Sequence, residues 1–330
     1  SGFCMFETAT TDFNITNTPY GKDILREVVD AFRKYDIAIG FYFSPDDFWL
    51  LHRQGTTVSR ARPEVNPLNN PELMAHNKAQ VTELLTNYGF IDMMFYDGEA
   101  SELNELTWEL SPKTLVTRGD MPTPEQHIPD SPLPGPWEAN FTLGTQWAYK
   151  PTHENYKSGS KLIEMVIETR AKGGNLLLNV GPKPDGELPI QQTDRMMELA
   201  LWLFTNQEAI YDIRPLPVIR DSLTLDHDVW YTKDRDSDTI YAIIVGKPWP
   251  KGERKVITLK QVRATDATEV EIVGQNGKVL EYKPDVNPKG SWSQDESGLH
   301  CSVMRAQRLH NDNKWPNPVV IRVTNAEWAG

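Results

Sequence analysis

A carboxylate closes one of the most apolar stretches of this sequence. In FIDMMFYDGEA, residues 90–100, a mostly apolar run ends at Asp97, and Gly98 and Glu99 follow at once. In parallel α/β folds the ligand lies beyond the carboxyl ends of the strands, so a polar residue in this place is aimed at the site. Asp97 fits a cap of a following helix or turn equally well, and Glu99 fits a plain loop acid.

A second carboxylate lies in PGPWEANFTLGTQWAYK, a segment with too many aromatic residues for an ordinary exposed loop. Glu138 follows Trp137 there, and taken alone it would be interpreted as structural. Two strand-end acids among Trp137, Trp147 and Tyr149 indicate a sugar site instead. Aromatic faces pack against the apolar faces of a pyranose, and glycoside hydrolysis needs two acids, one of them with a raised pKa.

Other polar residues also follow expected strands. Arg118, in TLVTRGD, could hold a sugar hydroxyl or keep a carboxylate ionised, or it could pair with Asp120 on the surface. His52, in DDFWLLHRQG, could reach the sugar, although a lone histidine is more often structural. Asp46 and Asp47 are interpreted as turn residues.

Helix followed by strand is the repeating order in the first two thirds of the chain. Apolar residues at helical spacing precede a buried strand at 37–44, and a helix that opens at Pro71 precedes the strand FIDMMFY. TLVTRG is a further short strand, a helix near 162–167 precedes the strand NLLLNVG, and Thr193 is expected to cap a last helix. The Gly-rich 173–189 lacks the order of a phosphate loop and is interpreted as a helix stop, a strand and a turn.

Strands that alternate with helices predict a parallel sheet, and at this repetition the fold class is α/β with a (β/α) TIM-like barrel. A complete barrel takes about 250 residues. Only five or six candidate strands precede residue 212, so an incomplete barrel is expected. The pattern then changes to short or alternating segments that predict a C-terminal antiparallel β-sandwich: DVWYTKD, TIYAIIVG, KVITLK, TEVEIVG, VLEYKP, LHCSVMR and PVVIRVTN. A boundary within 213–218 gives a catalytic domain of 1–215 and a sandwich domain of 216–330.

Composition excludes several classes of function. A net charge of −12 argues against nucleic acid or an anionic membrane surface as the partner, because both need clustered Lys and Arg. No apolar run approaches the roughly 20 residues of a membrane helix. Cys4 and Cys301 are too far apart in sequence to suggest a disulfide framework or a zinc site. The opening SGFCMF has no signal-peptide pattern, which leaves the compartment open.

These motifs together resemble the family 29 glycoside hydrolases, the retaining α-L-fucosidases. GGNLLLNVGPKPDG, followed by a helix and by NQEAIYDIRP, carries the resemblance most strongly. SGFCMFETATTDFNI, IAIGFYFS, MMFYDGE, TPEQ and PWEANFTLGTQWAY fall in the same order as their counterparts in that family. The similarity runs from residue 1 to about residue 215, and the following sandwich also looks like the family's C-terminal domain.

The resemblance implies a function and a site. Asp97 matches the family's catalytic nucleophile, Glu138 its usual acid/base, and Arg118 an arginine near the sugar. The implied reaction is hydrolysis of a terminal α-L-fucoside of an oligosaccharide or glycoconjugate, with retention of configuration and without a metal or an organic cofactor. A retaining pair of carboxyl groups is expected about 5 Å apart.

One departure from the family pattern keeps other functions open. In the family, the counterpart of SGFCMF follows a strand that ends in two sugar-binding histidines, whereas this chain begins after them. The expected consequence is a homo-oligomer or a partner chain that completes the barrel, because open sheet edges pair readily. The rivals are a catalytically silent sugar-binding or interaction protein and a glycosidase for the related α-L-galactosides. The long loop at 46–65 is expected to reshape the pocket.

Overall fold

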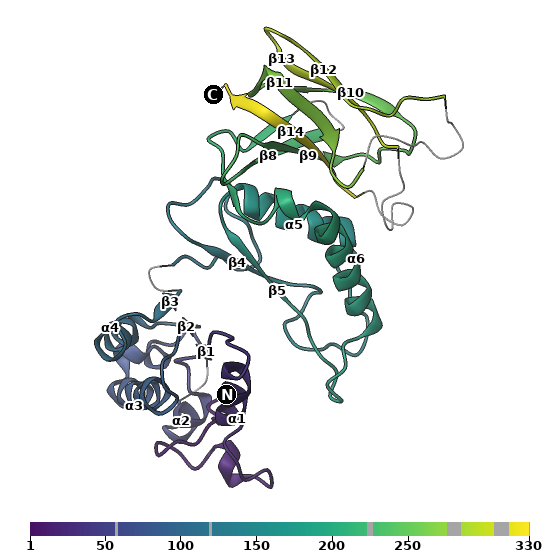
Figure 1. Ribbon diagram of the computed structural model, residues 1–330. Helices are drawn as coiled ribbons and strands as arrows, with labels where there is room; N and C mark the ends of the chain where they lie inside the picture. The colour runs from purple at the N-terminus through teal and green to yellow at the C-terminus, as the bar shows by residue number, and fades with distance from the viewer. Residues whose placement is uncertain (57–58, 119–120, 223–226, 276–284, 307–316, 330) are drawn as a thin grey trace. The chain divides into compact units, whose positions relative to one another are not determined.

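The chain forms two compact units, Ser1–Thr123 and Pro124–Gly330, and each is described by itself (Figure 1). The structure is a computed structural model and describes residues 1–56, 59–118, 121–222, 227–275, 285–306 and 317–329. Within these residues, no helix is both long and apolar enough to cross a membrane. Cys4 and Cys301 are free and buried.

A parallel sheet forms the centre of the first unit. Its strands are β1 (Gly40–Phe43), β2 (Met93–Tyr96) and β3 (Leu115–Thr117), in the order β1-β2-β3. The helices are α1 (Ile24–Arg33), α2 (Phe48–Arg53), α3 (Pro71–Asn87) and α4 (Ser101–Leu110), with short 3₁₀ turns at Ile15–Asn17, Pro63–Val65 and Pro67–Asn69. Strands that are consecutive in sequence are therefore neighbours in the sheet, as in a (β/α) barrel.

The pleat of this sheet separates a buried face from a more open one. Phe41 and Phe43 of β1 are buried with Met94 and Tyr96 of β2, whereas the residues between them are more exposed. Helix α3 begins as predicted, with Pro71 in its first turn and the Asn70 side chain accepting a hydrogen bond from the Leu73 N–H. Its apolar side packs with the buried strand residues into one core.

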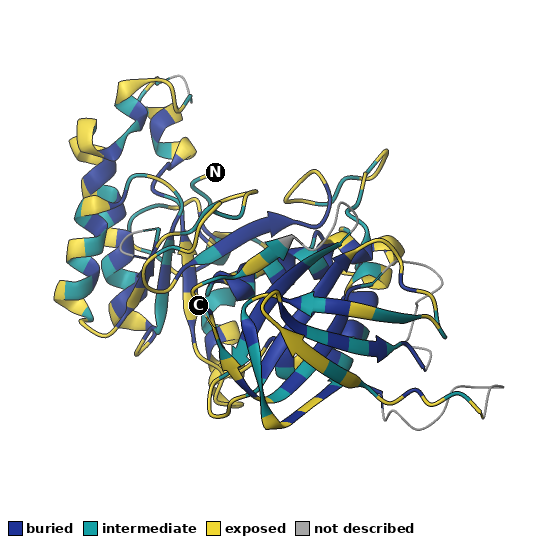
Figure 2. Cartoon of the chain, turned by 90° about the horizontal axis from the view of Figure 1, so that it is seen from above, coloured by how far each residue is buried: buried dark blue, intermediate teal, exposed yellow. Residues whose placement is uncertain are grey.

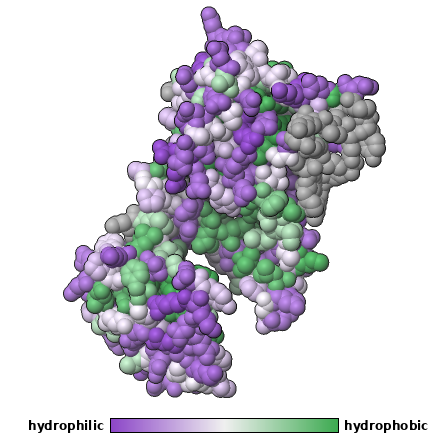
Figure 3. All heavy atoms as spheres, in the orientation of Figure 1, coloured by the Kyte–Doolittle hydropathy of each residue, from purple (hydrophilic) through white to green (hydrophobic). Residues whose placement is uncertain are grey.

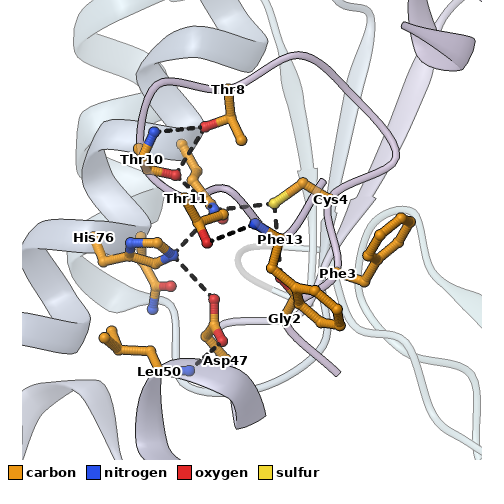
Figure 4. A network of polar contacts seen from close by, with 12 residues as sticks. Gly2, Phe3, Cys4, Thr8, Thr10, Thr11, Phe13, Asp47, Leu50 and His76 are labelled. Carbon is orange, nitrogen blue, oxygen red and sulfur yellow. Dashed lines mark hydrogen bonds and ion pairs between the residues drawn. The ribbon is translucent and has the colours of Figure 1, made fainter. Parts of the chain in front are cut away.

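A polar network fastens the N-terminal segment to α2 and α3 (Figure 4). Asp47 caps α2 by accepting from the Leu50 N–H at 2.8 Å, and its other oxygen lies 3.0 Å from Nε2 of His76 on α3. Gln80, one turn further along α3, reaches the Cys4 sulfur at 3.2 Å. Burial raises the pKa of Cys4 to about 11, so the thiol stays protonated. Asp47 is therefore a buried helix cap that also contacts the His76 ring, and it does more than the turn residue expected from sequence.

The second unit begins with a β-α-β segment. Strands β4 (Glu138–Thr142) and β5 (Asn175–Asn179) are parallel neighbours, and α5 (Gly159–Ala171) connects them. Helix α6 (Ile190–Asn206) and a 3₁₀ turn at Gln207–Ala209 follow. Ala139 and Phe141 of β4 pack against Leu162 and Met165 of α5, which gives this segment its own core.

An antiparallel β-sandwich completes the second unit, as predicted. Its strands are β6 (Ile213–Arg214), β7 (Arg220–Ser222), β8 (His227–Asp234), β9 (Ile240–Gly246), β10 (Arg254–Leu259), β11 (Val262–Ile272), β12 (Ser291–Asp295), β13 (Gly298–Met304) and β14 (Val319–Trp328). One sheet has the order β11-β14-β9-β8-β6, with β7 also paired to β8, and the other has the order β10-β13-β12. Buried residues of both sheets form one core, which Figure 2 shows in dark blue. A second core joins α5 and α6 to the larger sheet.

Some local predictions were wrong. Helix α6 begins at Ile190, and Thr193 lies inside its first turn, where its hydroxyl donates to the Pro189 carbonyl and caps no N–H. Helices α2 and α4 and strands β4, β6, β7 and β12 were not predicted. VLEYKP, at 279–284, lies outside the described residues. Helix α6 leaves apolar side chains exposed, including Phe204 at 79%. Figure 3 shows hydrophobic surface, in green, on the second unit.

Candidate active site

Asp97 lies directly beyond the carboxyl end of β2. Its N–H donates to the Phe43 carbonyl, so the β1–β2 ladder continues to this residue. Gly98 then has φ 149°, and a Cβ there would lie 3.1 Å from the Pro45 ring. Both conditions favour glycine. The strand-end position predicted for Asp97 is confirmed, and the helix-cap alternative is not, because Ala100 occupies the N-cap position of α4.

Three side chains from distant parts of the first unit surround the Asp97 carboxylate. Nη1 of Arg118 donates to Oδ1 at 2.6 Å, and the Tyr42 hydroxyl donates to Oδ2 at 2.5 Å. Nη2 of Arg60 lies 4.0 Å from Oδ2. The Asp97 side chain keeps 24% of its surface exposed. The carboxylate is therefore held in one orientation and still reaches solvent.

The open face of the sheet positions Tyr42 and Arg118. The Tyr42 ring stacks on Phe95 of β2, with centroids 5.5 Å apart, and the Arg118 guanidinium lies 5.2 Å from the same Phe95 ring. Arg118 directly follows β3 and has φ 57°, an uncommon conformation for a residue other than glycine. Desolvation and the hydrogen bond to Asp97 raise the pKa of Tyr42, which keeps the phenol protonated as a donor.

Glu99 and Asp46 have supporting contacts of their own. Glu99 accepts from the N–H and the hydroxyl of Ser101, and these bonds lower its pKa. It therefore helps to start α4, in keeping with the plain loop acid expected from sequence. Asp46, expected as a turn residue, is 6% exposed and accepts from Nε of Arg60 at 2.7 Å.

Glu138 lies in a very different environment in the second unit. It is the first residue of β4, so it lies at the amino end of the β4–β5 pair and does not close a strand as expected. Its side chain is half-buried, and desolvation raises its pKa. Within the described part of the chain, no hydrogen bond or ion pair reaches this carboxylate. A glutamate of this kind keeps its proton to a higher pH than usual.

The three aromatic residues predicted near the sugar have different surroundings. Trp137 is 1% exposed in the core beside α5, where its ring lies so close to Gly174 that a Cβ there would be 2.4 Å away. Trp147 is 41% exposed. Tyr149 lines a cleft of about 710 Å³, formed by the loops that follow β4 and β5. Trp137 therefore packs in the core beside β4 and β5. Trp147 and Tyr149 lie in the loop beyond the carboxyl end of β4.

His52 lies apart from the Asp97 cluster. It is exposed in the last turn of α2, and its ring lies 6.2 Å from that of Trp49. None of the contacts described for it reaches Asp97. Asp120, the alternative partner of Arg118, lies outside the described residues. In the described ranges, no group of three or more His, Cys, Asp or Glu side chains is arranged to hold a metal ion.

Sequence reasoning missed Tyr42, Arg60 and Asp46 as members of the site. Tyr42 lies 55 residues before Asp97 in the sequence. It was interpreted only as part of a mostly apolar, buried strand. The available signal for Arg60 was the length of the loop at 46–65, which was expected to reshape the pocket.

Parallel strands in sequential order, followed by an antiparallel β-domain, define a (β/α)-barrel type of protein with a C-terminal β-sandwich. The chain belongs to the α-L-fucosidase family. The family described as Alpha-L-fucosidase matches residues 1–208, and the Alpha-L-fucosidase C-terminal domain matches residues 221–316. The predicted boundary at 213–218 falls between the two matches and stays a prediction.

Individual relatives agree with this assignment. The chain is 27% identical over 282 residues to the plasma alpha-L-fucosidase of Pongo abelii, which covers 79% of this chain and 59% of the relative. It is 32% identical over 175 residues to the tissue alpha-L-fucosidase of Mus musculus, covering 52% and 33%. Alpha-L-fucosidase isoenzyme 1 of Paenibacillus thiaminolyticus has a similar structure, with a TM-score of 0.73, 27% identity, and coverage of 98% of this chain and 80% of that one. The chain thus spans about six tenths of the length of the first of these relatives.

Proposed function

We propose that this chain is a retaining exo-glycosidase that hydrolyses terminal α-L-fucosides of oligosaccharides or glycoconjugates. The observation that carries the proposal is the Asp97 carboxylate, solvent-accessible beyond a parallel strand and held by Arg118 and Tyr42. Membership of the α-L-fucosidase family supports the choice of sugar.

In the proposed double displacement, Asp97 is the nucleophile and Glu138 the acid/base. A carboxylate oxygen of Asp97 forms a bond to the anomeric carbon while the bond from that carbon to the aglycone oxygen breaks, and Glu138 gives its proton to the leaving oxygen. Water then attacks the anomeric carbon, its proton passes to Glu138, and the electron pair of the ester bond returns to Asp97. Two inversions at one carbon give retention. The steps use only these two carboxyl groups, so the proposal includes no metal or organic cofactor.

The surroundings of the two acids suit these two roles. A nucleophile must present an accessible oxygen in a fixed orientation, and the hydrogen bonds from Arg118 and Tyr42 hold the solvent-accessible Asp97 carboxylate in this way. A general acid must hold its proton near neutral pH, and the desolvation that raises the pKa of Glu138 acts in that direction. Trp147 and Tyr149 are proposed to contact the substrate, and His52 is kept as a weaker candidate.

The test is release of 4-nitrophenol from 4-nitrophenyl α-L-fucoside by the purified chain and by Asp97→Ala. Asp97→Ala should lose at least about a thousandfold in kcat, because a nucleophile has no substitute in a covalent mechanism. Glu105→Gln, which changes an exposed acid on α4, is the control and should keep full activity. The α-L-galactoside assayed alongside decides which sugar is preferred.

Two results would contradict the proposal. Substantial turnover by Asp97→Ala would remove Asp97 as the nucleophile. A folded wild-type chain that turns over neither sugar would favour the silent sugar-binding protein. Light scattering on the same samples checks the separate prediction of a homo-oligomer.

A further inference from the structure

A second cation faces Asp97 without bonding to it. Nη2 of Arg60 lies 4.0 Å from Oδ2 of Asp97, beyond hydrogen-bond distance, whereas Arg118 bonds to the other oxygen at 2.6 Å. The Arg60 side chain is 63% exposed, so it is not in place to fill a core. Its position needs another explanation.

The anchor of Arg60 is the buried carboxylate of Asp46. Nε of Arg60 donates to Oδ2 of Asp46 at 2.7 Å, and the Asp46 side chain is only 7% exposed. Asp46 follows β1 and lies against the turn after Asp97, because a Cβ on Gly98 would be 3.6 Å from its Oδ1. A charge-assisted bond to a buried, fixed acceptor limits how far the guanidinium can move. The hydrogen bond to Asp46 also raises the pKa of Arg60.

We propose that Arg60, anchored by Asp46, is a positioning residue for the second half of the reaction, in which it stabilises the negative charge that returns to Asp97. This inference rests on the proposed function. When the Asp97 oxygen bonds to the anomeric carbon, the carboxylate loses its charge and its attraction to Arg60. When water replaces Asp97 at that carbon and gives its proton to Glu138, the electron pair returns to Asp97 and the attraction is restored. A cation at 4.0 Å therefore opposes formation of the fucosyl–enzyme and favours its breakdown.

Arg60 is well suited to a test of charge alone. Because it makes no hydrogen bond to Asp97, its replacement removes a positive charge and leaves the bonds from Arg118 and Tyr42 in place. Arg62, two residues further along the same loop, pairs with Glu64 at 3.4 Å and is 54% exposed, which makes it a matched control.

The experiment measures steady-state and stopped-flow release of 4-nitrophenol from 4-nitrophenyl α-L-fucoside by the wild type, Arg60→Gln, Arg60→Lys and Arg62→Gln. In Arg60→Gln, kcat should fall about three- to tenfold, the size expected for one partly screened charge at this distance. KM should fall by a larger factor than kcat, so that kcat/KM rises, because loss of the cation also favours formation of the fucosyl–enzyme. A burst of nitrophenol should appear or grow. Arg60→Lys keeps the charge and should recover most of kcat, and Arg62→Gln should behave as the wild type.

Mass spectrometry of acid-quenched enzyme separates this inference from the proposed function. More covalent fucosyl adduct in Arg60→Gln than in the wild type supports the role of Arg60. An active wild type with unchanged adduct and kcat in Arg60→Gln overturns that role alone. A wild type with neither turnover nor adduct overturns the proposed function, and this inference with it.

The anchor is tested by a double-mutant cycle. Asp46→Asn should lower kcat in the same direction as Arg60→Gln, because a released guanidinium no longer stays near Asp97. The combined variant should be little worse than Arg60→Gln alone, since both changes remove the same effect. Effects that multiply in full would show that Asp46 does not act through Arg60.

Discussion

The two carboxylates proposed for catalysis lie in opposite environments. Asp97, in the first unit, accepts hydrogen bonds from an arginine and a tyrosine and has a second arginine nearby. Glu138, in the second unit, is half-buried at the start of a strand with no described partner, and its pKa is raised by desolvation. In the proposed mechanism, the surroundings and not the residue type assign the roles of nucleophile and acid/base to two side chains of the same chemistry.

After loss of the nucleophile in Asp97→Ala, removal of the carboxyl group from Glu138 should have the largest effect. In Glu138→Gln, hydrolysis of fucosides with a sugar aglycone should fall about a hundred- to a thousandfold, because a poor leaving group needs the proton. Hydrolysis of the 4-nitrophenyl fucoside should fall less, since nitrophenolate leaves without help. The measurement is kcat/KM for both substrates.

A matched control and the pH dependence make this prediction sharper. Glu164 on α5 is also half-buried with a pKa raised by desolvation, so Glu164→Gln changes a similar group elsewhere. It should keep its activity, and an equal loss there would show that burial alone explains the effect of Glu138→Gln. Because the acid must be protonated, wild-type kcat/KM should fall as the pH rises through the raised pKa of Glu138, and this alkaline decline should be absent in Glu138→Gln.

Loss of the Arg118 cation should have the next largest effect. In Arg118→Met, Asp97 loses the hydrogen bond that orients its carboxylate, and kcat/KM should fall about ten- to a hundredfold because the carboxylate is no longer held in place for attack. Arg118→Lys should recover only part of this loss, because an ammonium group does not reproduce the guanidinium beside Phe95. Kinetics of both variants on 4-nitrophenyl α-L-fucoside decide the point, and an unchanged kcat/KM in Arg118→Met would contradict it.

Replacement of the Tyr42 hydroxyl should have a smaller effect. Tyr42→Phe removes the donor to Oδ2 of Asp97 and keeps the ring that stacks on Phe95. One neutral donor to a charged acceptor gives an expected loss of about three- to tenfold in kcat. A variant as inactive as Asp97→Ala would mean that Tyr42 has a direct chemical role.

The sequence predicted what depends on local pattern. The apolar run before Asp97 showed a buried strand and its end, and Asn70-Pro71 showed where α3 begins. The partners of Asp97 were harder to find, because Tyr42 approaches it only when β1 pairs with β2, and Arg60 approaches it from a position bonded to Asp46. Nothing in the sequence near Asp97 encodes those contacts.

Aromatic residues near Glu138 show a second limit of sequence reasoning. Trp137, Trp147 and Tyr149 look alike as candidates for a sugar contact, yet the first is buried in the core and the other two are not. WEANFT alternates apolar and polar residues, as a strand does, but the segment was interpreted only for its aromatic residues and was not predicted as a strand. Because this strand was not predicted, Glu138 was expected to follow a strand, whereas it is the first residue of β4.

The smallest predicted effect is on stability, and it should have opposite signs at the two acids. Desolvation raises the pKa of Glu138 in the folded state, so its stabilising contribution is present at low pH and is lost as the pH rises through that value. Glu138→Gln cannot ionise and should match the wild type near pH 4 but be more stable at pH 8, by at most about 1 kcal/mol because the half-exposed group is screened. Asp97→Asn should be less stable at pH 8 by about 1–2 kcal/mol, since the charged pair between Asp97 and Arg118 is lost. Thermal unfolding of both variants at the two pH values measures these differences, and shifts of the same sign at pH 8 would mean that the two acids do not differ in environment as described.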